Sequence, residues 1–188
     1  MFTGSRVGAR PGYVGAAREL SRVLVERSYG LVYGGGNVGL MGVIADAVLE
    51  HHGYVIGVIP EAFVEREVAH RGLTELRIVN SMHERKAAMG ELADGFIAMP
   101  GGIGTMEEFF EVLSWAQLGL HSKPCGLLNV EGYYDRLSQF LDHAVEQDFL
   151  KPKHRGLLIM EQESQKLLDR LEEFMASHVA ERFDRNKT

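Results

Sequence analysis

The chain is poor in the residues that mark several classes of protein. It has one cysteine among 188 residues, so disulfide scaffolds and cysteine-based zinc sites are excluded within one chain. No window approaches the roughly 20 apolar residues of a membrane span, and no basic segment followed by an apolar one opens the chain. Lys and Arg number 20 against 26 Asp and Glu, which is the opposite of a basic nucleic-acid-binding surface. We therefore expect a cytoplasmic protein that binds neither nucleic acid nor membrane.

The remaining composition is that of a globular domain. Hydrophobic residues make up 45% of the chain and charged residues 24%, which at this length supplies one sizeable core. We expect a single domain over residues 1–180 and a charged tail over 181–188. Cys125 lies in an apolar run, and we interpret it as a core residue. Met1–Thr3 is short for a strand before Gly4, so the first strand is either short or lacks its start.

Strand-like and helical runs alternate along the chain. The strand-like runs cover residues 30–33, 54–59, 75–79, 96–99, 124–128 and 157–160. The helical runs cover residues 12–27, 40–51, 82–92, 107–118, 133–147 and 162–178. This alternation predicts a Rossmann-like, doubly wound parallel sheet in a three-layer α/β/α arrangement.

The most informative segment is Pro-Gly-Gly-Ile-Gly-Thr-Met-Glu-Glu, from Pro100 to Glu108. It follows an apolar strand and precedes a helix, and its glycines allow the backbone to turn sharply and approach a ligand. The free N–H groups at the start of the helix attract a phosphate, and Glu108 lies one turn away. A simpler alternative is a capping box formed by Thr105 and Glu108.

Two other loops follow predicted strands. They are Gly34–Gly39, in which Gly35 and Gly36 are candidate ligand contacts, and Asn80-Ser81. Because ligands of such sheets bind outside the carboxyl ends of the strands, the three loops are expected at one edge. A tight turn is an equally good explanation of Gly34–Gly39 taken alone.

Charged side chains accompany these loops. Arg85 and Lys86 lie early in the helix that Ser81 opens, where an anion explains them better than solvent does. Thr105, Glu108, Glu111 and Ser114 recur every three residues along a helix that is otherwise apolar, so this stripe is expected to face a cavity or a partner. Glu107 and Glu111 either compensate the helix dipole or line the site.

These motifs resemble the Lonely Guy (LOG) family. The similarity runs from about Gly4 to Met160 and includes Tyr-Gly-Gly-Gly at 33–36 with Gly-Leu-Met-Gly at 39–42. It continues with Met-His-Glu-Arg-Lys at 82–86 and with Pro-Gly-Gly-Ile-Gly-Thr at 100–105, ending in Glu108. The pairing of His-x-Arg-Lys with Pro-Gly-Gly-x-Gly-Thr-x-x-Glu is specific.

The resemblance implies a cytokinin riboside 5′-monophosphate phosphoribohydrolase, long labelled lysine decarboxylase. Such an enzyme cleaves the N-glycosidic bond between adenine, often N6-prenylated, and ribose 5′-monophosphate, without metal or cofactor, and it forms a homodimer. By the family pattern, Arg85 and Glu108 are the catalytic pair. The residues expected to line the nucleotide site are Glu67, Arg85, Lys86, Gly102, Ile103, Gly104, Thr105, Met106, Glu107, Glu108 and Ser114. Ser114 and Arg6 depart from the family, which often has threonine and serine there.

The residue types suit this chemistry on physical grounds. Glycosidic cleavage passes through an oxocarbenium-like sugar, which a carboxylate such as Glu108 stabilises while orienting water. A guanidinium such as Arg85 neutralises the departing purine or clamps the phosphate. A broader nucleoside-monophosphate nucleosidase and a non-catalytic nucleotide or cofactor carrier remain open. Lysine decarboxylation is untenable, because nothing supplies the electron sink that it requires.

Overall fold

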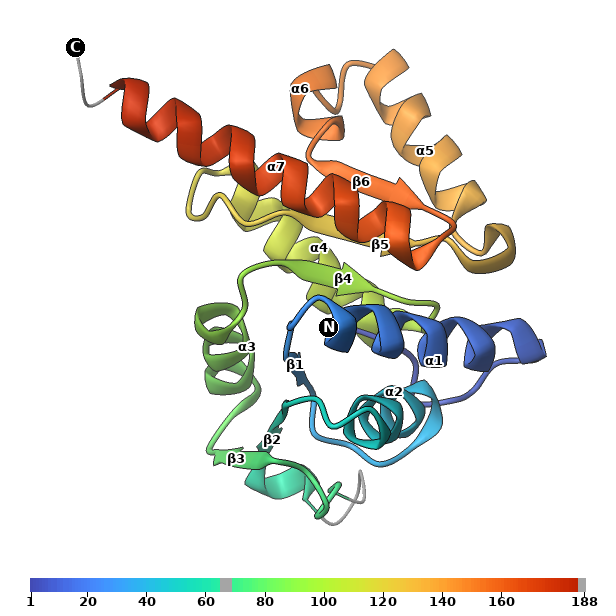
Figure 1. Ribbon diagram of the computed structural model, residues 1–188. Coiled ribbons are helices and arrows are strands. Elements are labelled where there is room, and N and C mark those ends of the chain that lie inside the picture. Colours follow the sequence, from blue (N-terminus) through green and yellow to red (C-terminus); the bar gives the residue numbers. More distant parts are fainter. Residues whose placement is uncertain (65–68, 186–188) are drawn as a thin grey trace.

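Strands and helices alternate as the sequence predicts in the computed structural model, which describes residues 1–64 and 69–185, with side chains up to residue 177 (Figure 1). The strands are β1 Leu31–Tyr33, β2 Val55–Pro60, β3 Glu75–Val79, β4 Phe96–Ala98, β5 Cys125–Leu128 and β6 Leu158–Glu161. The α-helices are α1 Pro11–Glu26, α2 Gly39–Glu50, α3 Met82–Leu92, α4 Ile103–Gln117, α5 Asp135–Glu146, α6 Pro152–Arg155 and α7 Ser164–Arg185. Two 3₁₀ turns, η1 Glu61–Phe63 and η2 Val130–Gly132, complete the elements.

The start of the chain joins two three-stranded parallel sheets, ordered β1-β2-β3 and β4-β5-β6. Phe2 pairs in parallel with Ala98 of β4, and the backbone nitrogen of Met1 donates to the carbonyl oxygen of Val32 in β1 at 2.8 Å. The combined order is β3-β2-β1, then residues 1–3, then β4-β5-β6. Strand order therefore reverses between residues 1–3 and β4, which is the ligand-binding position in sheets of this kind.

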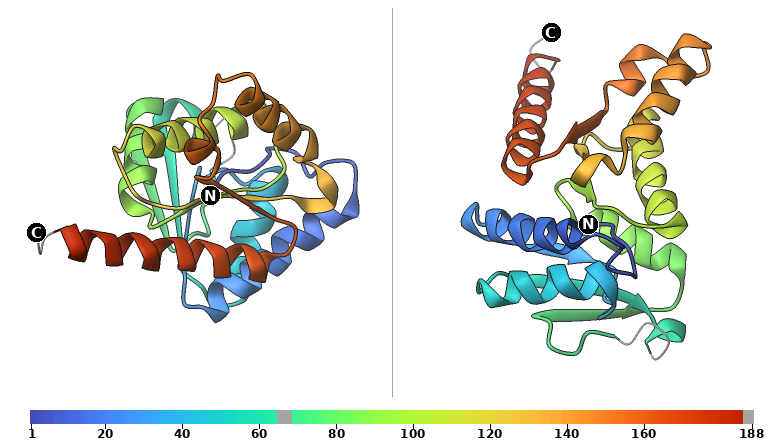
Figure 2. Two further views of the ribbon diagram at one scale, coloured as in Figure 1. Left: turned by 90° about the horizontal axis from the view of Figure 1, so that it is seen from above. Right: turned by 90° about the vertical axis from the view of Figure 1, so that its right-hand side faces the viewer.

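Helices cover both faces of the sheet, which gives the expected three layers (Figure 2). Side chains of α1, α2 and α7 form one core with one face of the strands. Side chains of α3, α4 and α5 form a second core on the other face. In β4 and the residue that follows it, Phe96 and Ala98 belong to the second core, whereas Ile97 and Met99 belong to the first. This alternation follows from the two-residue period of a strand and fixes β4 between the layers.

Several predicted elements are confirmed. Strand β3 has the predicted bounds, and α3 begins directly after Ser81, whose side chain accepts a hydrogen bond from the N–H of Glu84 at 3.1 Å. The Glu84 carboxylate bonds the N–H of Asn80, so the reciprocal half of this cap is displaced by one residue. Cys125 is buried in β5 as expected, and burial raises the pKa of its thiol to about 12.

The observed start of helix α4 differs from the predicted one and excludes one alternative interpretation of its sequence. It begins at Ile103 rather than near Glu107, and its N-cap is Gly102, so Thr105 lies inside the first turn. The capping box of Thr105 and Glu108 is therefore wrong. Glycine's low helix propensity hid the true start, because the sequence from Gly101 to Gly104 indicates a loop.

The end of the chain is more helical than expected. The four-residue helix α6 was not predicted, and α7 continues to Arg185, beyond the predicted end at His178. The segment expected as a tail from residue 181 is therefore helical up to that point, and residues 186–188 lie outside the described part of the chain.

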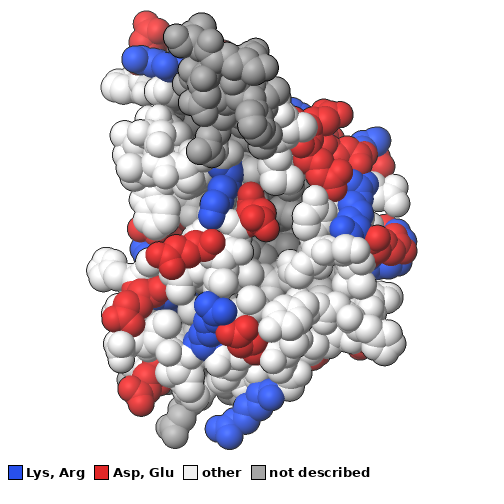
Figure 3. Space-filling view, turned by 60° about the vertical axis from the view of Figure 1, so that its left-hand side comes forward, with Lys and Arg blue, Asp and Glu red and all other residues white. Residues whose placement is uncertain are grey.

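The described surface carries charge of both signs. On the face shown in Figure 3, acidic and basic side chains are interspersed among uncharged ones. Among the residues that the structure describes, no helix has both the length and the apolar character needed to cross a bilayer.

Two phenylalanines test how the core contributes to stability. Phe109 of α4 is fully buried, whereas Phe149, after α5, is 90% exposed. We expect Phe109→Ala to lower the free energy of unfolding by about 3–5 kcal/mol, because it removes buried apolar contacts and leaves a cavity. Phe149→Ala should change it by less than about 0.5 kcal/mol. Chemical denaturation of both variants measures the difference, and equal effects would contradict the packing described.

Candidate active site

Three loops meet at the carboxyl edge of the sheet. The N–H of Gly4, which follows residues 1–3, donates to the carbonyl oxygen of Pro100 at 3.1 Å, and the N–H of Leu40 donates to that of Gly4 at 3.0 Å. Gly39 has a φ of +58°, and a Cβ there would lie 2.2 Å from the carbonyl carbon of Ser5. Only glycine allows this approach, so these loops are packed backbone against backbone.

The first turn of α4 is open towards ligand. The first helical hydrogen bond runs from the N–H of Met106 to Gly102, so the preceding N–H groups point out of the helix end. A Cβ on Gly102 or Gly104 would meet nothing within 4 Å, whereas one on Gly101 would lie 2.1 Å from Thr105 Oγ1. The loop is thus packed against the protein at Gly101, whereas the space beside Gly102 and Gly104 is open, as an anion site at a helix N-terminus requires.

Arg85 of α3 and Glu108 of α4 lie together beside this turn. Arg85 Nη2 is 3.4 Å from Glu108 Oε1, and the two side chains are only 7% and 13% exposed. A Cβ on Gly34 would lie 2.0 Å from Arg85 Nη2, so the glycine after β1 makes room for the guanidinium. The predicted catalytic pair therefore comes from α3, which precedes β4 in the chain, and from α4, which follows it. The loop at Gly34 leaves space for the guanidinium of this pair.

One hydrogen-bond donor of the Arg85 guanidinium is not used among the described residues. Its Nη1 donates weakly to the sulfur of Met82 at 3.5 Å, and its Nε is buried without a hydrogen-bond partner among the described residues. A buried donor left unpaired is costly, and it is explained when a ligand completes it. Arg85 can therefore hold Glu108 and still donate to a bound molecule.

Lys86, Glu107 and Glu111 form a second link between α3 and α4, which we call the α3–α4 clamp. Lys86 Nζ lies 2.8 Å from Glu107 Oε1 and 2.9 Å from Glu111 Oε1. These hydrogen bonds, to Glu107 and then to Glu111, raise the pKa of Lys86. The clamp is adjacent in sequence to the Arg85–Glu108 pair on both helices.

The remaining predicted residues are distributed unevenly. Ile103 and Met106 lie in the first turn of α4, with Ile103 90% exposed. Ser114 is exposed near the other end of α4. Residues that repeat every three positions are displaced by about 60° around the helix axis at each step. Ser114, three steps after Thr105, therefore lies on the opposite face of the helix. The structure therefore does not bring Ser114 to the face that carries Thr105. Glu67 lies outside the described residues.

Gly35 and Gly36 are buried beneath the segment that precedes β3. The N–H of His70 donates to the carbonyl oxygen of Gly35 at 2.9 Å, and Gly36 forms an isolated antiparallel bridge with Ala69. The buried His70 accepts from the N–H of Gly72 through Nδ1 and bonds Asp46 through Nε2 at 2.8 Å. These contacts join residues 69–72 to the loop after β1 and to α2, and they occupy the carbonyl oxygen of Gly35.

Two tyrosines that sequence analysis missed fix the glycine loop. The hydroxyl of Tyr133 donates to the carbonyl oxygen of Gly101, and that of Tyr134 to Met99, each at 2.6 Å. Glu131 and Gly132 in η2 have positive φ values, and this turn presents both rings. The sequence carried no local signal for this role, because the two tyrosines read as the start of a helix that in fact begins at Asp135.

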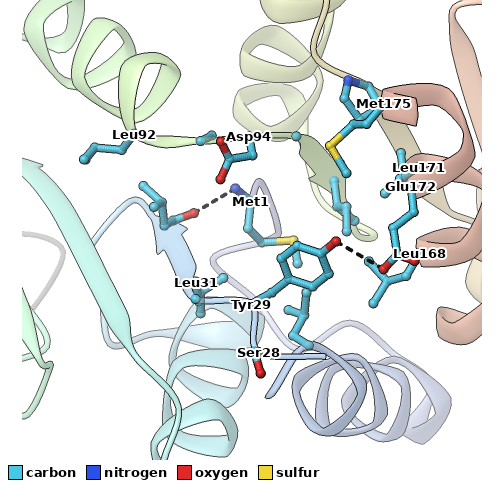
Figure 4. A pocket seen from close by; sticks show the side chains of 17 residues that line it. Met1, Ser28, Tyr29, Leu31, Leu92, Asp94, Leu168, Leu171, Glu172 and Met175 are labelled. Carbon is cyan, nitrogen blue, oxygen red and sulfur yellow. Dashed lines mark hydrogen bonds between the residues drawn. The ribbon is translucent and has the colours of Figure 1, made fainter. Parts of the chain in front are cut away.

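A separate cavity of about 210 Å³ opens at the amino ends of the strands (Figure 4). Its walls include Met1, Leu31, Ile97 and Leu168, and the hydroxyl of Tyr29 donates to Glu172 beside it at 3.1 Å. None of the predicted site residues that the structure describes lines it. In the described part of the chain, no cluster of three or more His, Cys, Asp or Glu side chains is arranged to hold a metal ion.

The chain is similar to known proteins along most of its length. A family model described as "Possible lysine decarboxylase" matches residues 41–171. A rice protein named "Probable cytokinin riboside 5'-monophosphate phosphoribohydrolase LOGL9" is 51% identical over 175 residues, which are 93% of this chain and 77% of that protein. The Arabidopsis thaliana "Cytokinin riboside 5'-monophosphate phosphoribohydrolase LOG1" is 47% identical over 178 residues, which are 95% of this chain and 84% of that protein.

Solved structures share the fold at low sequence identity. The molybdenum cofactor binding protein of Rippkaea orientalis has a TM-score of 0.66 at 20% identity, covering 92% of this chain and 94% of that one. The molybdenum cofactor carrier protein of Chlamydomonas reinhardtii has a TM-score of 0.66 at 16% identity, covering 93% and 94%. At this identity the likeness establishes the fold alone.

Removing one hydroxyl tests whether Tyr133 fixes the glycine loop. We expect Tyr133→Phe to weaken AMP binding about 2- to 12-fold, because the loop loses a hydrogen bond of about 0.5–1.5 kcal/mol. Tyr29→Phe is the matched control, since its hydroxyl bonds Glu172 beside the other cavity. Calorimetric titration with AMP measures both, and unchanged affinity in Tyr133→Phe would contradict this role.

Proposed function

The chain belongs to the family whose curated members are named cytokinin riboside 5′-monophosphate phosphoribohydrolases, and from this premise we propose that it hydrolyses the N-glycosidic bond of adenosine 5′-monophosphate and its N6-prenylated forms. The products are the free base and ribose 5-phosphate. The observation that carries the proposal is the buried Arg85–Glu108 pair beside the open first turn of α4.

The phosphate binds at the N-terminus of α4. The outward N–H groups of the first turn and the open side of Gly102 and Gly104 supply donors and space for it. Glu108 lies six residues further along, about 9 Å along the helix axis at 1.5 Å per residue. This separation leaves room for the ribose between the phosphate and the carboxylate.

Glu108 acts on the anomeric carbon. As the bond from C1′ of the ribose to the adenine nitrogen lengthens, its electron pair leaves with the base and the sugar becomes an oxocarbenium-like cation. The carboxylate stabilises this charge and orients the attacking water. Water supplies the hydroxyl group on C1′ and, in sum, the proton on the released base.

Arg85 holds Glu108 and donates to the nucleotide. Its Nη2 lies 3.4 Å from Oε1 of Glu108, and this attraction between opposite charges orients the carboxylate. The buried Nε that lacks a partner among the described residues is assigned to the substrate, where it neutralises negative charge that develops in the reaction. Both roles need a permanently charged guanidinium, which lysine does not reproduce.

The alternatives are less well supported. A carrier without turnover does not require Arg85 and Glu108 together, and the proteins named as molybdenum cofactor carriers are only 16–20% identical to this chain. Decarboxylation of lysine through a Schiff base needs a lysine of lowered pKa, whereas carboxylates raise that of Lys86. A broader nucleosidase differs from the proposal only in the base that it accepts. The cytoplasmic location expected from the sequence stays a prediction.

A homodimer is part of the proposal. Leu118 and Leu120, at the end of α4 and just beyond it, are 69% and 70% exposed. Contiguous apolar patches exposed on a surface mark protein–protein interaction sites. We infer that a second copy of the chain covers them.

Base release from AMP and from N6-isopentenyl-AMP tests the activity. We expect release from both, with Glu108→Gln and Arg85→Lys each lowering the rate on the order of 10²- to 10³-fold, because each removes charge or geometry needed in the transition state. Glu91→Gln, an exposed residue of α3, should behave as wild type. Nucleotide binding without release by the wild-type protein would overturn the enzyme assignment and favour a carrier.

The oligomeric state tests the role of the exposed leucines. We expect the wild-type chain to be dimeric by light scattering and the double variant Leu118→Lys with Leu120→Lys to be monomeric, because two buried ammonium groups are not tolerated in an apolar interface. Phe149→Lys, at a strongly exposed position after α5, should leave the mass unchanged. A monomeric wild-type protein would contradict the dimer.

A further inference from the structure

The α3–α4 clamp uses Lys86 for contacts within the protein. Its ammonium has three N–H groups, and two of them meet Glu107 and Glu111 at 2.8 and 2.9 Å. The Lys86 side chain is only 14% exposed, and that of Glu111 is 26% exposed. Lys86 is thus held at a fixed point between two carboxylates of the neighbouring helix rather than extended towards a ligand.

The charge around Lys86 disfavours a phosphate. Two carboxylates and one ammonium give the clamp a net charge of −1, and Arg85 with Glu108 adds none. A nucleotide phosphate carries negative charge and is repelled by such a group. The open N-terminus of α4 is the better anion site, since its outward N–H groups carry partial positive charge.

The clamp and the predicted catalytic pair are neighbouring links between the same two helices. Lys86 follows Arg85 on α3, and Glu107 precedes Glu108 on α4, so the two ionic links between the helices are neighbours. The Arg85–Glu108 contact alone is 3.4 Å long, whereas the clamp contacts are shorter. The clamp therefore sets the spacing and rotation of the two helices at the point where the pair must meet.

We propose that Lys86 is a positioning residue that sets the Arg85–Glu108 geometry through Glu107 and Glu111, and that it does not bind the substrate phosphate. This inference rests on the proposed function. It differs from the expectation drawn from the family pattern, which counts Lys86 and Glu107 among the residues lining the nucleotide site.

Comparison of AMP with adenosine separates the two roles. In Lys86→Gln, we expect kcat to fall on the order of 10- to 10²-fold on both substrates, because a small misplacement of catalytic groups has this effect, with little change in KM. The ratio of kcat/KM for AMP to that for adenosine should stay within about 2-fold of wild type. Lys166→Gln, an exposed lysine paired with Glu163, is the control and should change nothing.

Inhibition by ribose 5-phosphate gives a second readout that does not depend on turnover of adenosine. We expect its inhibition constant against AMP to be the same in Lys86→Gln and wild type within about 2-fold. A phosphate contact at Lys86 predicts instead a selective loss on AMP and a matching rise of this constant, and either result would overturn the proposal.

A charge exchange provides the sharpest test. Lys86→Glu should abolish most activity, because three carboxylates then face each other. Adding Glu111→Lys restores the composition of the clamp and gives Glu107 a cationic partner four residues further along α4, which is a favourable spacing. We expect the double variant to regain at least about 10-fold in kcat over Lys86→Glu. No recovery in a double variant that melts at the wild-type temperature would refute a positioning role.

These outcomes are distinct from failure of the proposed function. If the wild-type chain releases no base, the catalytic assignment fails before any clamp variant is compared. Even then, ribose 5-phosphate titrated calorimetrically into wild type and Lys86→Gln decides whether Lys86 contacts phosphate, since equal dissociation constants support the clamp and a weakened one contradicts it.

Discussion

At the point where strand order reverses, the backbones of Gly4 and Gly101 touch. A Cβ on Gly4 would lie 3.2 Å from the α-carbon of Gly101, and one on Gly101 would lie 2.9 Å from the nitrogen of Gly4. This contact holds the first turn of α4 beside the loop that precedes α1, and the carbonyl of Gly4 in turn receives the N–H of Leu40 in α2. The open helix end, the Arg85–Glu108 pair and the tyrosine hydrogen bonds are all placed relative to this junction, so the site depends on two positions without side chains.

Much of the architecture was predictable because its signals are local. The apolar run before Pro100 and the side-chain cap of Ser81 each specify an element from a few adjacent residues, and the structure confirms both. The predicted start of α4 was wrong because glycines occur both in loops and at helix ends. Gly102 and Gly104 indicate a loop, yet Gly102 is the N-cap of α4 and Gly104 lies in its first turn. Tyr133 could not be found at all, because its partner Gly101 is 32 residues away in sequence.

The same fold serves proteins with different names, so the side chains at the sheet edge must carry the difference. The molybdenum cofactor proteins match the backbone at TM-scores of 0.66 but share no more than 20% of residues with this chain. The relatives at 47–51% identity carry the phosphoribohydrolase name. We therefore propose that the Arg85–Glu108 pair and its clamp carry the activity of this chain, and that the sheet holds them in place.

The position of residues 1–3 in the middle of the sheet has a consequence for synthesis on the ribosome. Thr3 bonds the carbonyl oxygen of Pro100 across 97 residues, and Phe2 pairs with Ala98, so residues 1–3 find one of their neighbours in the sheet only after the intervening residues have also left the exit tunnel. Strands β1 to β3 can associate earlier, but their central edge stays uncovered in the meantime. Such long-range pairing slows folding and exposes a strand edge during translation, which makes the nascent chain a natural client for chaperones.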